Sequence, residues 1–158
     1  MEDQSFIYRS SKTFRGFPCA HRRWRHRGHC SQVHGYDREV TIWFEAHVRD
    51  ENGFVMDFSL LKPIQAWLES QFDHTLLLDE DDPLVPKFAA LAREGACRLV
   101  LLPDVGMEGS GRHVFDYVHG WVQDVTEGRV WVHSVEMREN SKNSALVCRG
   151  QMGQIRPA

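Results

Sequence analysis

The stretch from Cys19 to Asp37 holds the side chains best suited to chemistry in this chain. Four of the nine histidines and two of the four cysteines lie within it, namely His21, His26, His29, His34, Cys19 and Cys30. Imidazole nitrogen and thiolate sulfur are preferred zinc ligands, and a thiolate beside cationic groups is also reactive. The stretch therefore indicates a metal site, a reactive thiol or both, with a solvated basic loop as the alternative.

The spacing of three of these residues suits a shared metal ion. If the chain is a strand from residue 34 onward, His34 and Tyr36 share one of its faces. His21 ends the preceding expected strand, so it meets them if the two strands pair. Because catalytic zinc usually has three strong protein ligands, the third is either Tyr36 or a histidine of the loop, His26 or His29.

Two further positions carry the types of side chain used in proton transfer. Cys30 lies among arginines, which lower the pKa of a thiol and favour its thiolate; the alternative is a half-exposed structural cysteine. Asp73 directly precedes His74, and a carboxylate bonded to an imidazole fixes its tautomer and tunes its basicity. An isolated Asp-His pair is more often part of a polar loop.

Two glutamates are candidate ligand-binding groups. Glu136 lies in a valine-rich alternating segment, which predicts that it shares a face with Val130, Val132 and Ser134. There it is either a solvent-facing residue or a buried anchor for a cationic or amide-like ligand edge. Glu108 opens an expected helix, where the helix dipole favours a carboxylate in any case.

Length and composition bound the class of protein. The 158 residues fit one domain over 1–158, and 42% hydrophobic with 26% charged residues is ordinary for a soluble globular protein. A net charge of −3 gives no general attraction to nucleic acid, although residues 22–27 are arginine-rich and 79–82 acidic. We expect no signal peptide and no membrane span, and therefore a cytoplasmic protein with free thiols.

Hydrophobic periodicity predicts an α+β protein with few helices and a mostly antiparallel sheet. We expect a loop over 22–33, a short buried run at 76–78, and a helix start capped by Ser59. The expected strands are 5–20 (broken near Ser10–Ser11 and Gly16), 38–49, 54–58 returning after a turn at 51–53, 97–102, 130–137 and 144–149. The expected helices are 60–72, 84–94 and 108–123.

Taken in order, these motifs resemble the family of 6-pyruvoyl-tetrahydropterin and 6-carboxytetrahydropterin synthases over nearly the whole chain. The Phe-x-Ala-Ala-His strand of that family is similar to residues 17–21, and its Cys-x-x-x-His-Gly-His motif to residues 30–36. Its Val-x-Asp-Phe and Asp-His motifs are matched at 55–58 and 73–74. Its Pro-Thr-x-Glu-Asn helix start and its Val-x-Glu-Thr strand are matched only in part, at 105–109 and 135–137.

The resemblance implies the tunnelling fold, with an antiparallel four-stranded sheet and two long helices. Subunits of that family join their sheets into a barrel as trimers or hexamers, with active sites between subunits. It implies Zn²⁺ on His21, His34 and the residue at position 36. It makes Cys30 the general base, Asp73 and His74 its relay partners, and Glu136, with Glu108 close by, the anchor of the pterin.

The implied substrate is 7,8-dihydroneopterin triphosphate, and the implied product is 6-carboxytetrahydropterin for queuosine-type deazapurine synthesis. The alternatives are 6-pyruvoyl-tetrahydropterin formation, or a pterin- or purine-binding oligomer without zinc. Tyr36 replaces the third family histidine, which allows weak zinc binding, zinc completed by another residue such as His29, or no metal. The arginines of 22–27 are either a phosphate contact or a solvated loop; an RNA-binding module is disfavoured by the net negative charge.

Overall fold

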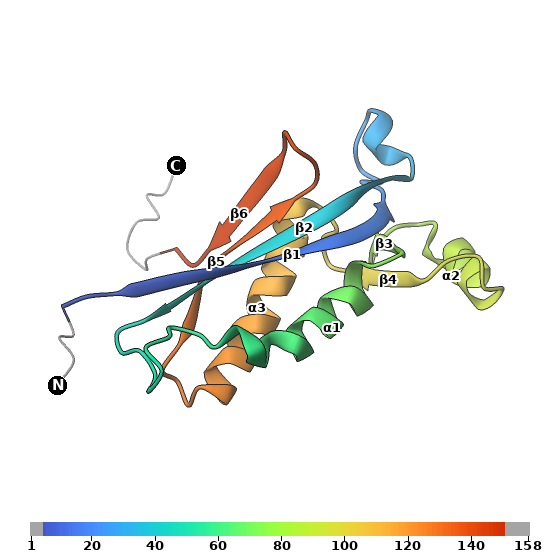
Figure 1. Cartoon of the computed structure of the whole chain (residues 1–158). Helices are drawn as coiled ribbons and strands as arrows, with labels where there is room; N and C mark the ends of the chain where they lie inside the picture. Colours follow the sequence, from blue (N-terminus) through green and yellow to red (C-terminus); the bar gives the residue numbers. More distant parts are fainter. Residues whose placement is uncertain (1–4, 151–158) are drawn as a thin grey trace.

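The computed structural model describes residues 5–150, which form a curled six-stranded sheet with helices on one face (Figure 1). The strand order is β4-β3-β1-β2-β5-β6. The helices are α1 (Lys62–Phe72), α2 (Val85–Arg93) and α3 (Met107–Val125). The strands are β1 (Tyr8–His21), β2 (His34–Ala46), β3 (Thr75–Asp79), β4 (Leu99–Leu102), β5 (Trp131–Arg138) and β6 (Ser144–Cys148).

The core lies between the sheet and the two longer helices. Alternate residues of β2 point toward α1 and α3, and Val40, Ile42 and Phe44 are each 0% exposed. We call this the inner face of the sheet and the opposite side the outer face. The apolar residues of α1 and α3 recur at helical spacing, so burying one stripe of each helix closes the core.

The expected four-stranded antiparallel sheet is wrong, because the sheet is six-stranded and mixed. Strand β3 pairs in parallel with β1 on one side and with β4 on the other. All five residues of β3 are buried. A strand covered on both faces has no polar alternation, so the sequence shows only a short apolar run there. The structure of one chain does not describe an oligomeric barrel.

The expected returning strand at 54–58 is also wrong. The turn is present, since Gly53 donates to the carbonyl oxygen of Asp50 at 2.9 Å and has a φ of 81°. Beyond it the chain leaves the sheet, because both edges of β2 are already paired with β1 and β5. Asp57, and not Ser59, caps the following helical turn by accepting the backbone N–H of Ser59 at 2.8 Å.

Two irregularities decide which side chains share a face. The first is in β1, where the register shifts between Phe14 and Phe17 at Gly16 (φ 83°), as expected; pairing is continuous through Ser10 and Ser11. The second is in β5, where Trp43 and Phe44 of β2 pair with Ser134 and Val132, leaving His133 as an extra residue. This bulge had no signal in the sequence.

Candidate active site

The end of the β1–β2 ladder brings three predicted site residues together. His21 is paired with His34, and Tyr36 lies two residues farther along β2 on the same inner face. The ring centroids of His21 and His34 are 4.4 Å apart, and that of Tyr36 lies 6.2 Å from His21 and 5.7 Å from His34. The spatial arrangement on which the predicted metal site depends is therefore present in one chain.

His21 is held as a neutral imidazole. It is 4% exposed, and its Nδ1 is buried without a hydrogen-bond partner among the described residues. Burial, followed by the positive charge of Arg38 and the nearness of His34 and Arg23, lowers the pKa of His21 to about 3. A neutral ring with an unpaired nitrogen is the state in which histidine binds a metal.

His34 and Tyr36 are oriented by different partners. Nδ1 of His34 lies 2.8 Å from the carbonyl oxygen of Gln32, which can only accept, so the neutral ring keeps the lone pair on Nε2. The charge of Glu139, and a hydrogen bond to its carboxylate, raise the pKa of the Tyr36 phenol. Tyr36 therefore keeps its proton at neutral pH and is a weaker metal ligand than a third imidazole.

The loop histidines do not complete this set. Within residues 5–150, no group of three or more histidine, cysteine, aspartate or glutamate side chains is placed to hold a metal ion. His29 therefore does not join His21 and His34 in a three-residue site here. His26 instead uses its Nδ1 to accept the backbone N–H of Gly28 at 2.9 Å.

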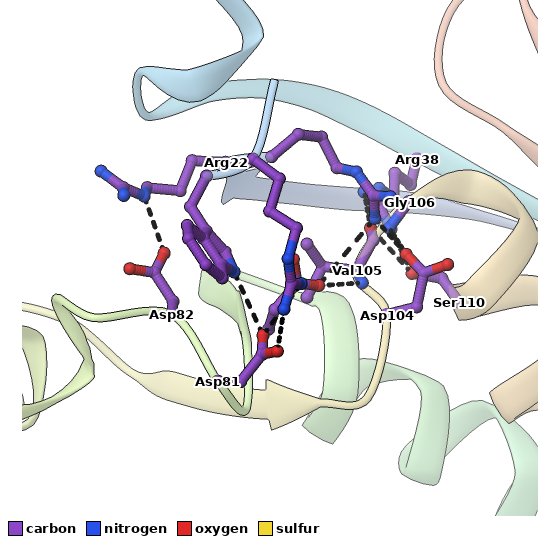
Figure 2. A network of polar contacts seen from close by, with 12 residues as sticks. Arg22, Arg38, Asp81, Asp82, Asp104, Val105, Gly106 and Ser110 are labelled. Atoms are coloured by element: carbon purple, nitrogen blue, oxygen red, sulfur yellow. Dashed lines mark hydrogen bonds and ion pairs between the residues drawn. The ribbon is translucent and has the colours of Figure 1, made fainter. Parts of the chain in front are cut away.

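Ion pairs join the loop that carries Cys30 to the segments that follow β3 and β4 (Figure 2). Nε of Arg22 donates to Asp82 at 2.7 Å, and these side chains are 15% and 0% exposed. Arg23 binds Asp104 with its guanidinium, and its backbone N–H donates to the carbonyl oxygen of Cys30 at 2.7 Å. Cys30 itself is half-buried and forms no disulfide.

These ion pairs change the interpretation of the arginine-rich segment. Arg25 is also paired, with the exposed carboxylate of Asp81. A Cβ on Gly106 would lie 2.9 Å from Nη1 of Arg23, so the missing side chain at the start of α3 leaves the space that this guanidinium occupies. Three arginines predicted as phosphate contacts or as a solvated loop therefore serve to position the loop.

Asp73 and His74 form a hydrogen-bonded pair, with Oδ1 of Asp73 2.6 Å from Nδ1 of His74. His74 has a φ of 54°, and its side chain is 78% exposed. It lines a shallow pocket of about 530 Å³ at the end of the β1–β2 ladder, together with the outer-face positions Pro18 and Asp37 and also with Tyr36. Among the hydrogen bonds of the described residues, none joins this pair to Cys30.

Glu136 lies on the outer face of the sheet, opposite Thr41 of β2. Its predicted shared face with Val130 and Val132 is wrong, because the bulge at His133 reverses the alternation between Val132 and Ser134. Glu108 is exposed in the first turn of α3, which packs on the inner face. Within one chain the two glutamates are therefore on opposite sides of the sheet.

Two residues near the site had no signal in the sequence. Glu139 follows β5 directly and reaches Tyr36, a contact that only the strand register creates. Arg38 is 1% exposed on the inner face, where it donates to Ser110 Oγ at 2.8 Å and to the carbonyl oxygen of Val105 at 3.1 Å. A charged residue in an alternating strand is normally read as solvent-facing, so neither role was predictable.

Comparison with known proteins places the chain in a family. The statistical model of the family described as 6-pyruvoyl tetrahydropterin synthase matches residues 10–150. The chain belongs to this family. The 6-carboxy-5,6,7,8-tetrahydropterin synthase of Rickettsia typhi is 35% identical over 72 residues, covering 45% of this chain and 52% of that protein. The synthase of the same name from Aquifex aeolicus is 29% identical over 105 residues, covering 56% and 64%.

Solved structures of other proteins share the fold. An uncharacterized protein from Wolinella succinogenes superposes with a TM-score of 0.78 at 24% identity, covering 92% of this chain and 100% of that one. The Plasmodium vivax 6-pyruvoyl tetrahydropterin synthase has a TM-score of 0.65 at 18% identity, covering 91% and 99%. The chain spans about half the length of the first curated relatives that it matches in sequence. No helix within residues 5–150 is long and apolar enough to cross a membrane.

Proposed function

We propose that this chain is a lyase that converts 7,8-dihydroneopterin triphosphate to 6-carboxytetrahydropterin, for queuosine-type deazapurine synthesis. The observation that carries the proposal is the convergence of His21, His34 and Tyr36 at one end of the β1–β2 ladder, in a chain of this family. The curated relatives that match in sequence are named 6-carboxy-5,6,7,8-tetrahydropterin synthases, which favours the 6-carboxy product. Formation of 6-pyruvoyl-tetrahydropterin is the alternative within the same chemistry.

The donor set fits Zn²⁺ through its two imidazoles. His21 offers a neutral ring with an unpartnered buried nitrogen, and His34 is fixed with Nε2 free; Tyr36 is the third, weaker group. Zinc bound there would act as a Lewis acid toward the side-chain hydroxyls of the substrate.

Other residues of the chain carry out proton transfer and substrate binding. Cys30, as thiolate, takes the proton from the side-chain carbon next to the one that bears triphosphate, and the electron pair left behind expels triphosphate. The 6-carboxy product also requires water to add at the side-chain carbon attached to the ring, with cleavage of the adjacent C–C bond and release of the two outer carbons as acetaldehyde. Asp73 fixes the tautomer of His74, which exchanges protons with the reacting centre. Glu136 accepts the N–H groups of the pterin ring, with Glu108 as a second carboxylate.

Within one subunit these groups are spread over both faces of the sheet, since Glu136 occupies an outer-face position of its strand and His21 and His34 occupy inner-face positions. We therefore propose a homo-oligomer, a trimer or hexamer, in which the inner-face residues of one copy meet the outer-face residues of another. We place the protein in the cytoplasm, where the four cysteines, all unpaired in the structure, stay reduced.

The test is to incubate the purified protein with dihydroneopterin triphosphate and identify the product by mass spectrometry. A 6-carboxytetrahydropterin product supports the proposal, a 6-pyruvoyl product selects the alternative, and no triphosphate release contradicts both. Metal analysis distinguishes a second candidate, a pterin- or purine-binding oligomer without zinc. That candidate is favoured by one observation, the Tyr36 phenol bonded to Glu139 and kept protonated. It requires a zinc content well below one per chain.

A further inference from the structure

The carboxylate proposed to hold the pterin already has a partner in this chain. Nη2 of Arg138 donates to Oε1 of Glu136 at 2.6 Å. The two residues lie two positions apart on the outer face of β5, and their side chains are 35% and 27% exposed. A ligand that binds both oxygens of Glu136 therefore competes with the guanidinium of Arg138 for Oε1.

The chemistry of the two competitors is the same. An aminopyrimidinone edge presents an amino N–H and a ring N–H on neighbouring nitrogens, in parallel. A guanidinium presents the same fork of donors, and a carboxylate accepts either one through its two oxygens. We propose that Arg138 occupies the ligand site on Glu136 in the free protein and sets the affinity for aminopyrimidinone rings. This inference rests on the proposed role of Glu136 as the pterin anchor.

The strand register provides a place for the displaced guanidinium. Arg138 is paired with Glu39 across the β2–β5 ladder, and its Nε already lies 3.9 Å from Oε1 of Glu39. The other oxygen of Glu39 holds Nε of Arg15 at 2.7 Å. The neighbours of Glu136 across the two ladders, Thr41 and Leu146, carry no charge. Arg138 thus moves from one carboxylate to the next, and its charge stays paired.

The size of the effect follows from the exposure of the pair. Exposed ion pairs contribute up to about 1 kcal/mol, so removing the competitor should tighten ligand binding by up to about fivefold. A residue with a purely structural role would weaken binding when replaced. A gain in affinity on losing a cation is therefore specific to the competition.

The experiment titrates the assembled full-length protein with pterin, followed by fluorescence, in four variants. Arg138→Met should lower the dissociation constant about twofold to fivefold, and Arg138→Gln should change it in the same direction. Arg15→Met, which removes a cation from Glu39 but not from Glu136, should leave it unchanged. Glu136→Gln should weaken binding about tenfold or more.

The outcomes separate the inference from the proposal beneath it. If Glu136→Gln weakens binding while both Arg138 variants bind pterin no more tightly than the parent, the competition is overturned and the anchor stands. If Glu136→Gln leaves binding unchanged, the anchor itself is misassigned and the inference falls with it. Tighter binding by Arg15→Met as well would attribute the gain to net charge and also overturn the inference.

Discussion

The inner and outer faces of the sheet prepare their functional residues in different ways. On the inner face, His21 is buried and neutral, and the loop that carries Cys30 is tied down by a buried ion pair between Arg22 and Asp82. On the outer face, the His74 side chain is 78% exposed, and the polar partner of Glu136 among residues 5–150 is Arg138, its neighbour on the strand. The inner-face residues are therefore preorganised within one chain, whereas the outer-face residues have few fixed polar contacts.

This contrast is what we expect if one site is shared between two subunits, as proposed. Groups that bind a metal or deprotonate carbon need fixed geometry, which the core and the ion pairs provide. Groups that act only after a second subunit binds must stay accessible, so they cannot be buried within their own chain. The predictions below test each side of the contrast.

The largest expected effect is on the inner face, at the proposed base. Cys30→Ala should lower the rate of triphosphate release about 1,000-fold or more, because general bases contribute about 10² to 10⁴. The rate is measured with dihydroneopterin triphosphate as substrate. Cys148→Ala, which removes an exposed cysteine at the end of β6, is the matched control and should retain the parent rate. A comparable loss of rate in both variants would show that Cys30 has no specific role as the general base.

The third metal position should respond to restoration of the missing imidazole. Tyr36→His should tighten zinc binding about tenfold, because a neutral imidazole replaces a phenol that Glu139 keeps protonated. Competition with a chromophoric chelator measures the affinity, and elemental analysis gives the stoichiometry. An unchanged affinity would place the ion elsewhere.

The stability that each ion pair of the Cys30 loop contributes should depend on how deeply that pair is buried. Asp82→Asn leaves the mostly buried Arg22 without its counter-charge and should cost about 2 kcal/mol of unfolding free energy. Asp81→Asn, which breaks the exposed pair with Arg25, should leave stability unchanged within error. Denaturant unfolding of both variants makes the comparison. Equal effects would mean that the loop is not anchored through the buried pair.

The smallest expected effect is on the pH dependence of stability. Although burial opposes it, the Gly106 N–H and Arg23 hold the pKa of Asp104 below its ordinary value. As the pH falls, Asp104 is therefore protonated in the unfolded chain before it is protonated in the folded protein. The stability that Asp104 contributes is complete above the ordinary aspartate pKa and is lost below it.

Melting temperatures of the parent and Asp104→Asn from pH 7 to pH 3 test this sign. The two curves should differ by a constant amount above about pH 5 and converge below about pH 4. Curves that diverge in acid would reverse the assignment.

The sequence predicted what is local and periodic. The long helix ending at Val125 and the alternating strand through Ile42 follow directly from hydrophobic spacing. The parallel strand Thr75–Asp79 did not, because a strand buried on both sides loses its alternation. The pairing of the arginines at 22–25 with the carboxylates at 79–82 was not predictable either. Both runs are visible in the sequence, but only the tertiary fold brings them together.

The same distinction holds within the site. The meeting of His21 and His34 was predicted on the condition that the second strand begins at residue 34, and it does; hydrophobic alternation alone placed the start of that strand at residue 38. The face of Glu136 did not follow, because a single bulged residue, His133, reverses it. No composition or spacing rule signals such an insertion.

The central claim is that inner-face and outer-face groups from different copies make one site, and subunit mixing tests it most directly. Cys30→Ala and His74→Ala proteins, each inactive alone, are dissociated together and reassembled, and triphosphate release is measured. The claim predicts that the mixture regains about a quarter of the parent activity, because some interfaces then pair an intact Cys30 with an intact His74. A mixture as inactive as its components would show that both residues act within one subunit.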